Sequence, residues 1–164
     1  MNNNLNQINT EVYKKCDLKI SDFQVEPESK AYNACRFKLN GLQIICRNAK
    51  ITPKKIGQFV TCWKRNGNGS IEPFEENDPV NFYVVIVRTE KEFGQFVFPK
   101  SVLINKGIIS THKKEGKRAF RVYPKWNITK NKQAEQAQKW QLDYFYEINT
   151  STDYNKAIAL FKNV

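Results

Sequence analysis

The sequence predicts an α+β fold with a mixed, mostly antiparallel sheet of five to six strands flanked by helices. Short β-prone runs recur between residues 32 and 123, and turn residues separate them. The run 82–88, F-Y-V-V-I-V-R, is apolar on both faces, as a central strand is. Helical spacing of apolar residues occurs near the two chain ends and in a short segment after Pro99. Together these patterns favour one sheet with helices around it.

The N-terminal segment combines a polar tail, a helix and a connector. Residues 1–4 are Met and Asn only, and we expect them to be disordered. Apolar residues at near-helical spacing predict a short helix over 5–15. The polar segment 17–28 ends in Glu-Pro-Glu, which is typical of a connector.

A β-hairpin is the clearest local prediction. Two β-prone runs, 32–39 and 42–47, flank Asn40-Gly41, and this pair supplies the positive φ angles that a type I′ turn needs. Cys35, Phe37 and Leu39 alternate with basic residues in the first run. The hairpin should therefore have one apolar face and one basic face.

The later elements follow from the same patterns. We expect a loop at 52–57, strands at 58–65, 82–88, 95–98 and 119–123, a short helix at 100–106, a basic loop at 112–118, and the longest helix at 131–148. Pro99 or Lys100 begins the short helix, and Gly107 ends it. Thr152 or Asp153 caps a last helix. Its inner face comprises Ala157, Leu160, Phe161 and Val164.

The charge balance indicates an anionic partner. Among 164 residues, Lys and Arg number 27 against 16 acids, which gives a net charge of +11 and a pI near 9.5. Nine basic residues and no acid fall between residues 29 and 71, and ten basic residues and one acid fall between 93 and 134. Because evenly solvated surfaces mix the two signs, this segregation predicts binding to the phosphate backbone of DNA or RNA.

The stretch 47–65 concentrates these charges, with six cations and no acid in nineteen residues. Phe59 and Trp63 lie among them and could stack on single-stranded bases if exposed. If strands 32–39, 42–48 and 58–65 lie side by side, the cations share one surface. The candidate phosphate-binding residues are Arg47, Lys50, Lys54, Lys55, Lys64, Arg65, Lys100, Arg118 and Arg121.

Several classes of protein are disfavoured. The four cysteines form no CxxC pair and His112 is the only histidine, so we expect no metal site and no cofactor. The N-terminus is polar and lacks the apolar region that a signal peptide has, and the longest apolar run, 82–87, is too short for a bilayer. We therefore expect a cytoplasmic protein with reduced thiols and no membrane partner. Nothing in the sequence sets an oligomeric state.

An ordered set of segments resembles the MepB family. They are G-L-Q-I-I-C-R-N-A-K-I-T-P-K-K-I-G-Q-F-V-T-C-W-K-R, then I-E-P-F with a following Asp, G-Q-F-V-F-P-K, K-R-A-F-R-V-Y-P-K-W and Q-A-x-x-A-Q-K-W-Q-x-x-Y-F. The resemblance runs from about residue 28 to 146 and implies one domain over 1–164. It implies a small bacterial cytoplasmic protein, of a kind sometimes encoded beside a multidrug efflux pump, with no enzymatic activity to carry over.

Two alternatives to a non-enzymatic, sequence-nonspecific nucleic-acid-binding protein remain open. The β-β-α-β order over 82–123 is similar to a restriction-endonuclease-like core, in which an Asp and a (D/E)-x-K triplet hold Mg²⁺. Asp78 and Lys100 take two of these positions, Phe98 stands where the acid belongs, and Glu28 is a further candidate. This order allows a degenerate Mg²⁺-dependent nuclease.

The other alternative is a small-molecule-binding accessory protein of a drug-resistance operon. Trp140-Gln141 and Tyr144-Phe145 on the last long helix could line a pocket for a planar ligand. Cationic drugs would be the ligands to test.

Overall fold

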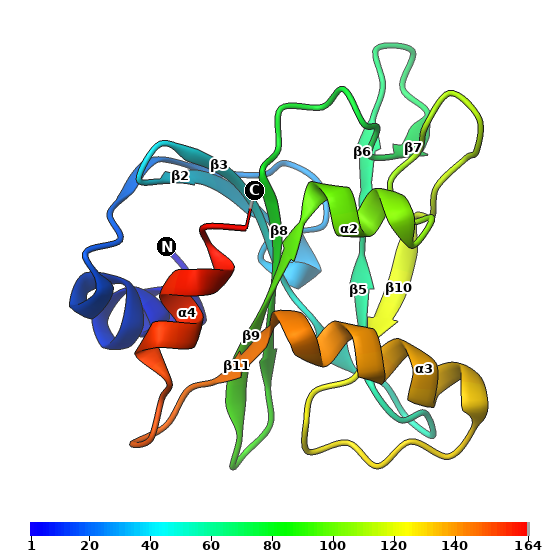
Figure 1. The fold of residues 1–164 in the computed structure, drawn as a ribbon. Helices are drawn as coiled ribbons and strands as arrows, with labels where there is room; N and C mark the ends of the chain where they lie inside the picture. Colours follow the sequence, from blue (N-terminus) through cyan, green and yellow to red (C-terminus); the bar gives the residue numbers. More distant parts are fainter. Residues whose placement is uncertain (164) are drawn as a thin grey trace.

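A six-stranded sheet, sheet A, separates the protein into two layers (Figure 1). The computed structural model describes residues 1–163, so Val164 of the predicted last helix lies outside the described residues. The strands of sheet A, in spatial order, are β1 (Ile20–Val25), β2 (Cys35–Leu39), β3 (Leu42–Asn48), β8 (Phe82–Arg88), β9 (Phe93–Pro99) and β11 (Phe145–Glu147). Only β3 and β8 run parallel. The predicted mixed, mostly antiparallel sheet and α+β class are confirmed.

Two smaller sheets complete the β structure. Sheet B has the order β10-β5-β4, with bounds Ala119–Val122, Gln58–Thr61 and Lys50–Ile51. The strands β6 (Trp63–Arg65) and β7 (Ile71–Pro73) form a separate hairpin. The predicted strand over 58–65 is divided into β5 and β6, and neither pairs with β3, so the supposed arrangement of 58–65 beside 42–48 does not occur. Cys62 interrupts the strand, and β3 pairs instead with β8, whose two apolar faces require a central position.

The helices are short. They are α1 (Asn3–Ile8), which continues through turns at Asn9–Tyr13 and Lys14–Cys16, a 3-10 turn at Lys30–Tyr32, α2 (Lys100–Asn105), α3 (Lys132–Gln141), a 3-10 turn at Leu142–Tyr144, and α4 (Tyr154–Leu160). The sequence predicted α2 and α4 closely. Asp153 caps α4 by accepting a 3.0 Å hydrogen bond from the Lys156 amide.

Three N-terminal and C-terminal expectations need correction. The structure orders residues 1–4, because Asn2 Oδ1 accepts a 3.0 Å bond from the Leu5 amide and caps α1. The expected connector 17–28 contains β1, which pairs with β2. The predicted helix 131–148 ends at Gln141, and β11 follows as an edge strand because Phe145 and Tyr146 point to opposite cores across sheet A.

The hairpin of β2 and β3 is as predicted. Asn40 and Gly41 have φ angles of 49° and 83°, as a type I′ turn requires. Cys35, Phe37 and Leu39 are buried, and the basic residues between them are partly exposed.

Each face of sheet A carries its own hydrophobic core. On one face, α1 and α4 pack against residues such as Phe37 and Phe82. On the other, α2, α3 and sheet B enclose a core that includes Val60, Phe98 and Val122. The second layer is the one that carries the basic segments discussed below.

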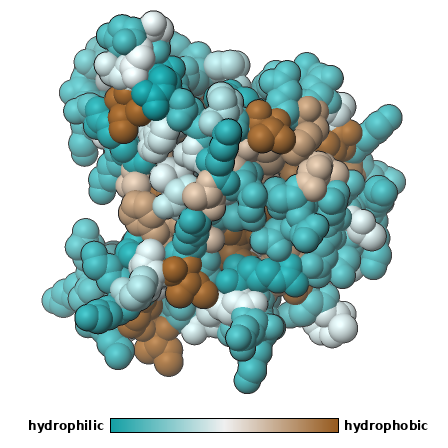
Figure 2. Space-filling view, turned by 180° about the vertical axis from the view of Figure 1, so that it is seen from behind, coloured by the Kyte–Doolittle hydropathy of each residue, from teal (hydrophilic) through white to brown (hydrophobic). Residues whose placement is uncertain are grey.

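The protein surface is largely polar. Figure 2, which shows the side opposite to α2, α3 and α4, has separate hydrophobic patches on a mostly hydrophilic surface. Among residues 1–163, no helix has the length and apolar character to cross a bilayer.

Candidate nucleic-acid interface

Two of the three predicted nuclease residues are neighbours. Lys100 Nζ donates a 2.6 Å hydrogen bond to the main-chain carbonyl of Asp78. The Asp78 carboxylate accepts 2.8 Å bonds from Lys64 Nζ and from the Glu75 amide. Glu28 instead accepts a 2.8 Å bond from Arg65 Nε. The structure therefore brings Asp78 and Lys100 together but commits Glu28 to another partner.

These residues do not fit an Mg²⁺ site. Phe98 occupies the acidic position of the triplet and is fully buried. Both Asp78 oxygens already accept hydrogen bonds. Within the described chain, no group of three or more His, Cys, Asp or Glu side chains could hold a metal ion. Mg²⁺ needs several oxygen ligands in octahedral geometry, and this arrangement does not supply them.

Lys64 and Arg65 each form an ion pair within the protein, with Asp78 and Glu28 respectively. Partial burial opposes the charged form of Lys64, but the hydrogen bond and charge of Asp78, with the nearby glutamates, outweigh it and raise the pKa of Lys64. The Arg65 hydrogen bond lowers the pKa of Glu28. Arg118 similarly pairs with Glu115 at 3.1 Å. These three cations are partly neutralised and are weaker candidates for phosphate contact.

Arg47 lies inside the protein and cannot contact a polyanion at the surface. Its side chain is 2% exposed, its Nη1 donates a 3.1 Å bond to the Cys46 carbonyl, and its Nε has no partner within residues 1–163. The guanidinium carbon lies 6.0 Å from the Tyr83 ring centroid. A basic residue in a strand can face either side, so sequence alone could not reveal this burial.

The loop with Lys54 and Lys55 is held by Arg121. Arg121 Nη1 lies 3.4 Å from the Ile56 carbonyl oxygen and 3.3 Å from that of Gly57, and its Nη2 donates to Thr52 Oγ1. Arg121 thus positions the two lysines, which are both exposed. The loop is a fixed part of the surface and presents its charges to solvent.

Sheet B aligns cations with aromatic rings. Lys50, Phe59 and Arg121 are cross-strand partners, so their side chains lie in a row on one face of the sheet. Arg121 Cζ lies 5.8 Å from the Phe59 ring centroid. Tyr32 covers the row, with its ring centroid 6.4 Å from that of Phe59 and 4.9 Å from Lys50 Nζ. Both rings are half-buried.

We call this surface the basic face, and it consists of Tyr32, Lys50, Lys54, Lys55, Phe59 and Arg121. Among residues 1–163, none of its lysines forms an ion pair. The sequence identified its cations. It did not identify Tyr32, which was assigned to a strand, because the 3-10 turn that carries it packs on sheet B only in three dimensions.

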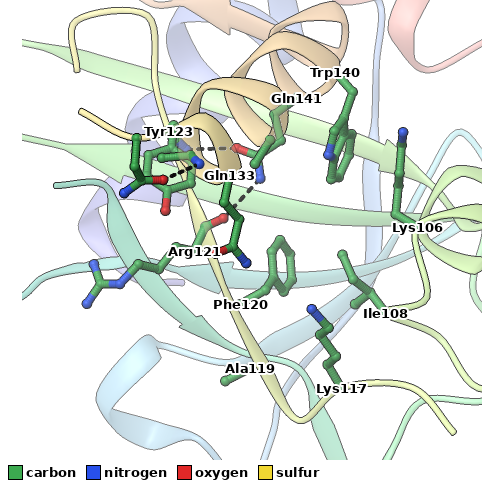
Figure 3. Close-up of a pocket in the computed structure, with 13 residues that line it drawn as sticks. Lys106, Ile108, Lys117, Ala119, Phe120, Arg121, Tyr123, Gln133, Trp140 and Gln141 are labelled. Carbon is green, nitrogen blue, oxygen red and sulfur yellow. Dashed lines mark hydrogen bonds between the residues drawn. The ribbon is translucent and has the colours of Figure 1, made fainter. Parts of the chain in front are cut away.

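A pocket of about 390 Å³ opens between β10 and α3 (Figure 3). Gln141 forms part of the wall of the pocket. Its side-chain amide accepts a 2.8 Å bond from the Tyr123 backbone amide and donates a 2.9 Å bond to the Arg121 carbonyl, and these bonds hold it against β10. Trp140 also lines the pocket, as expected for a ligand site on this helix. Tyr144 and Phe145 do not line it, because they pack into the core.

Comparison with known proteins identifies relatives of the fold. A family model described as MepB-like matches residues 26–147. The crystal structure of MepB shares 36% sequence identity, with a TM-score of 0.80, over 92% of this chain and 100% of that chain. A bacterial homing endonuclease, I-Ssp6803I, shares 15% identity with a TM-score of 0.43 over 79% of this chain and 80% of that one. That likeness is too distant to carry an argument. A search of curated proteins found no match.

Proposed function

This chain belongs to the MepB-like family, and we propose that it binds nucleic acid through the basic face, without sequence specificity and without cutting it. The observation that carries the proposal is the row of Lys50, Phe59 and Arg121 across sheet B, with Tyr32 beside it. It combines lysines that pair with no carboxylate of the described residues with half-buried rings on one surface.

The chemistry of this surface suits a single strand. Lysine ammonium groups neutralise phosphates and release counterions, which gives affinity without reading the bases. Aromatic rings stack on any unpaired base, and duplex bases are inaccessible to them. Lys54 and Lys55 extend the charged surface along the loop 52–57 that Arg121 holds. We therefore expect single strands to bind more tightly than duplexes of the same length.

Fluorescence anisotropy with labelled oligonucleotides of mixed sequence tests the proposal. Affinity should fall by at least tenfold between about 50 and 200 mM salt, since several phosphate contacts are lost together. The variant Lys50→Glu/Lys54→Glu/Lys55→Glu should abolish most binding. The control, Lys14→Glu/Lys91→Glu/Lys162→Glu, changes the net charge equally at three lysines outside the basic face. If both triple variants bind equally, the basic face is not the binding surface.

A further inference from the structure

The pocket between β10 and α3 has the charge of an anion site. Its thirteen lining residues include Lys106, Lys117 and Arg121, and none is an Asp or Glu. Arg121 contributes its backbone, and its guanidinium turns away to the loop 52–57 (Figure 3). Lys106 and Lys117 are exposed, and neither pairs with a carboxylate of the described chain. The two lysines favour an anionic ligand over a cationic one in this pocket.

The same pocket offers a flat apolar surface. Trp140 is half-buried, and its ring centroid lies 5.5 Å from that of Phe98 in the core, which fixes the indole. Lys106 Nζ lies 5.4 Å from the Trp140 ring centroid. Phe120 and Ile108 lie on the opposite side of the opening from α3 (Figure 3). An aromatic ring can therefore stack in the pocket while a charged group reaches the lysines.

Polar side chains complete the lining. Gln133 extends from α3 toward Phe120 (Figure 3), and Asn131 lies at the start of the same helix. Gln133 forms no side-chain hydrogen bond with the described residues, so its amide is available to a ligand. An amide can pair with the hydrogen-bonding edge of a base. The volume of about 390 Å³ lies at the lower end of the range for small-molecule sites.

We infer that this pocket binds one nucleotide, with its base against Trp140 and its phosphate at Lys106 and Lys117. The inference rests on the proposed function in that it assigns a discrete subsite to the same nucleic-acid-binding protein. The nucleotide is either free in solution or the 5′-terminal residue of a bound strand. Both sources present the same chemistry, namely a planar base and a phosphate monoester.

Isothermal titration with adenosine and cytidine 5′-monophosphate is the direct test. We expect saturable binding of the monophosphates, and binding at least tenfold weaker for the corresponding nucleosides, because the lysines then lose their partner. The variant Lys106→Ala/Lys117→Ala should weaken monophosphate binding by about tenfold or more. The control Lys91→Ala/Lys162→Ala removes the same charge far from the pocket and should bind normally. Circular dichroism of each variant confirms that it folds.

Oligonucleotides with and without a 5′-phosphate separate the two sources. Tighter binding of the phosphorylated strand, lost in Lys106→Ala/Lys117→Ala, assigns the subsite to a strand end. Equal binding of the two strands, together with monophosphate binding, assigns it to a free nucleotide.

Failure of this inference can be told apart from failure of the proposed function. The basic-face variant Lys50→Glu/Lys54→Glu/Lys55→Glu should keep its monophosphate affinity while losing strand affinity. Strand binding without monophosphate binding at about 1 mM would overturn the nucleotide pocket alone. Equal weakening by the pocket variant and its control would also overturn it.

Discussion

Lys100 binds the main-chain carbonyl of Asp78 and not its carboxylate. The carboxylate instead holds Lys64 and the Glu75 amide, each at 2.8 Å. Asp78 and Lys100, which the sequence suggested as residues of a degenerate nuclease site, therefore connect structural elements. They tie the start of α2 and the β6–β7 hairpin to the turn that precedes β8.

Replacing Asp78 should lower stability. In Asp78→Asn, Lys64 loses its charged partner at 2.8 Å and keeps Glu72 at 3.6 Å, and we expect a loss of about 1–2 kcal/mol in the free energy of unfolding. Urea denaturation measures it. The control Glu28→Gln breaks the more exposed pair with Arg65 and should change stability little. Equal losses in the two variants would contradict the structural role of Asp78.

Plasmid DNA should remain supercoiled when incubated with the protein and Mg²⁺ or Mn²⁺. Phe98 replaces the acid that a metal site needs, and Asp78 is engaged in hydrogen bonds. Agarose gels report nicking. Nicking that disappears in Asp78→Ala would revive the nuclease alternative.

Stability should fall at alkaline pH. Burial raises the pKa of Cys62 from 9.0 to about 12, and it also raises the pKa of Tyr13, Tyr83 and Tyr146 well above 10.0. The unfolded chain ionises these groups at lower pH than the folded protein does. Below about pH 9 these groups leave the free energy of unfolding unchanged. Above its unfolded pKa, each group lowers the free energy of unfolding by up to about 1.4 kcal/mol per pH unit.

Urea denaturation at a series of pH values from 8 to 11 tests this expectation. Tyr83→Phe should make the decline above pH 10 shallower, because one buried hydroxyl no longer ionises on unfolding. Tyr154→Phe removes an exposed hydroxyl and is the control. A decline of the same slope in both variants would count against burial as the cause.

Cys16 should react with a thiol reagent before the other three cysteines, because it is only partly buried, although burial and Asp17 raise its pKa. The hydrogen bond between the paired thiols lowers the pKa of Cys35 and raises that of Cys46, yet both are buried and out of reach. Cys62 is fully buried as well. We expect one fast equivalent in Ellman's assay of the native protein, and its loss in Cys16→Ser. Two or more fast equivalents would show that the β2–β3 region opens.

Gly57→Ala should be more harmful than Gly41→Ala. Both glycines have positive φ angles, 86° and 83°. An added Cβ at Gly57 would lie 2.7 Å from the Tyr123 ring, and at Gly41 it would meet nothing within 4 Å. Gly41→Ala should therefore cost about 1 kcal/mol from backbone strain alone, and Gly57→Ala at least about 1 kcal/mol more.

The nucleic-acid affinity of Gly57→Ala should also fall, because the substitution disturbs the loop that carries Lys54 and Lys55. Thermal unfolding and anisotropy measure the two effects. If both alanine variants behave alike, the contact with Tyr123 does not restrict this position.

Local chemistry explains what the sequence predicted. The type I′ turn depends on the positive φ angles of Asn40 and Gly41 alone. Asp153 caps α4 through the backbone amide of Lys156, three residues further on. The central strand β8 was recognisable because both of its faces are buried. Each of these features is determined within a few residues of the chain.

Long-range packing explains what it missed. Arg47 has the pattern of an exposed strand cation, but its side chain is buried beside Tyr83. Tyr32 lies 27 residues from Phe59 in the sequence, and only the fold brings their rings together. The same holds for Lys106 and Trp140, which approach across the pocket. Such pairings depend on which strand neighbours which, and the sequence does not encode that in a local pattern.

The side chain of Gln141 protects an outer strand from pairing with a second molecule. The outer strand of a sheet normally offers free backbone groups to which a second chain can add a strand, and this leads to aggregation. At β10 the Gln141 amide occupies the carbonyl of Arg121 and the amide of Tyr123, as a neighbouring strand would. One glutamine thus closes the β10 edge of sheet B within its own molecule. Loss of this glutamine would expose the backbone groups of β10 to pairing with a second molecule. The net positive charge of the protein would then be what opposes self-association.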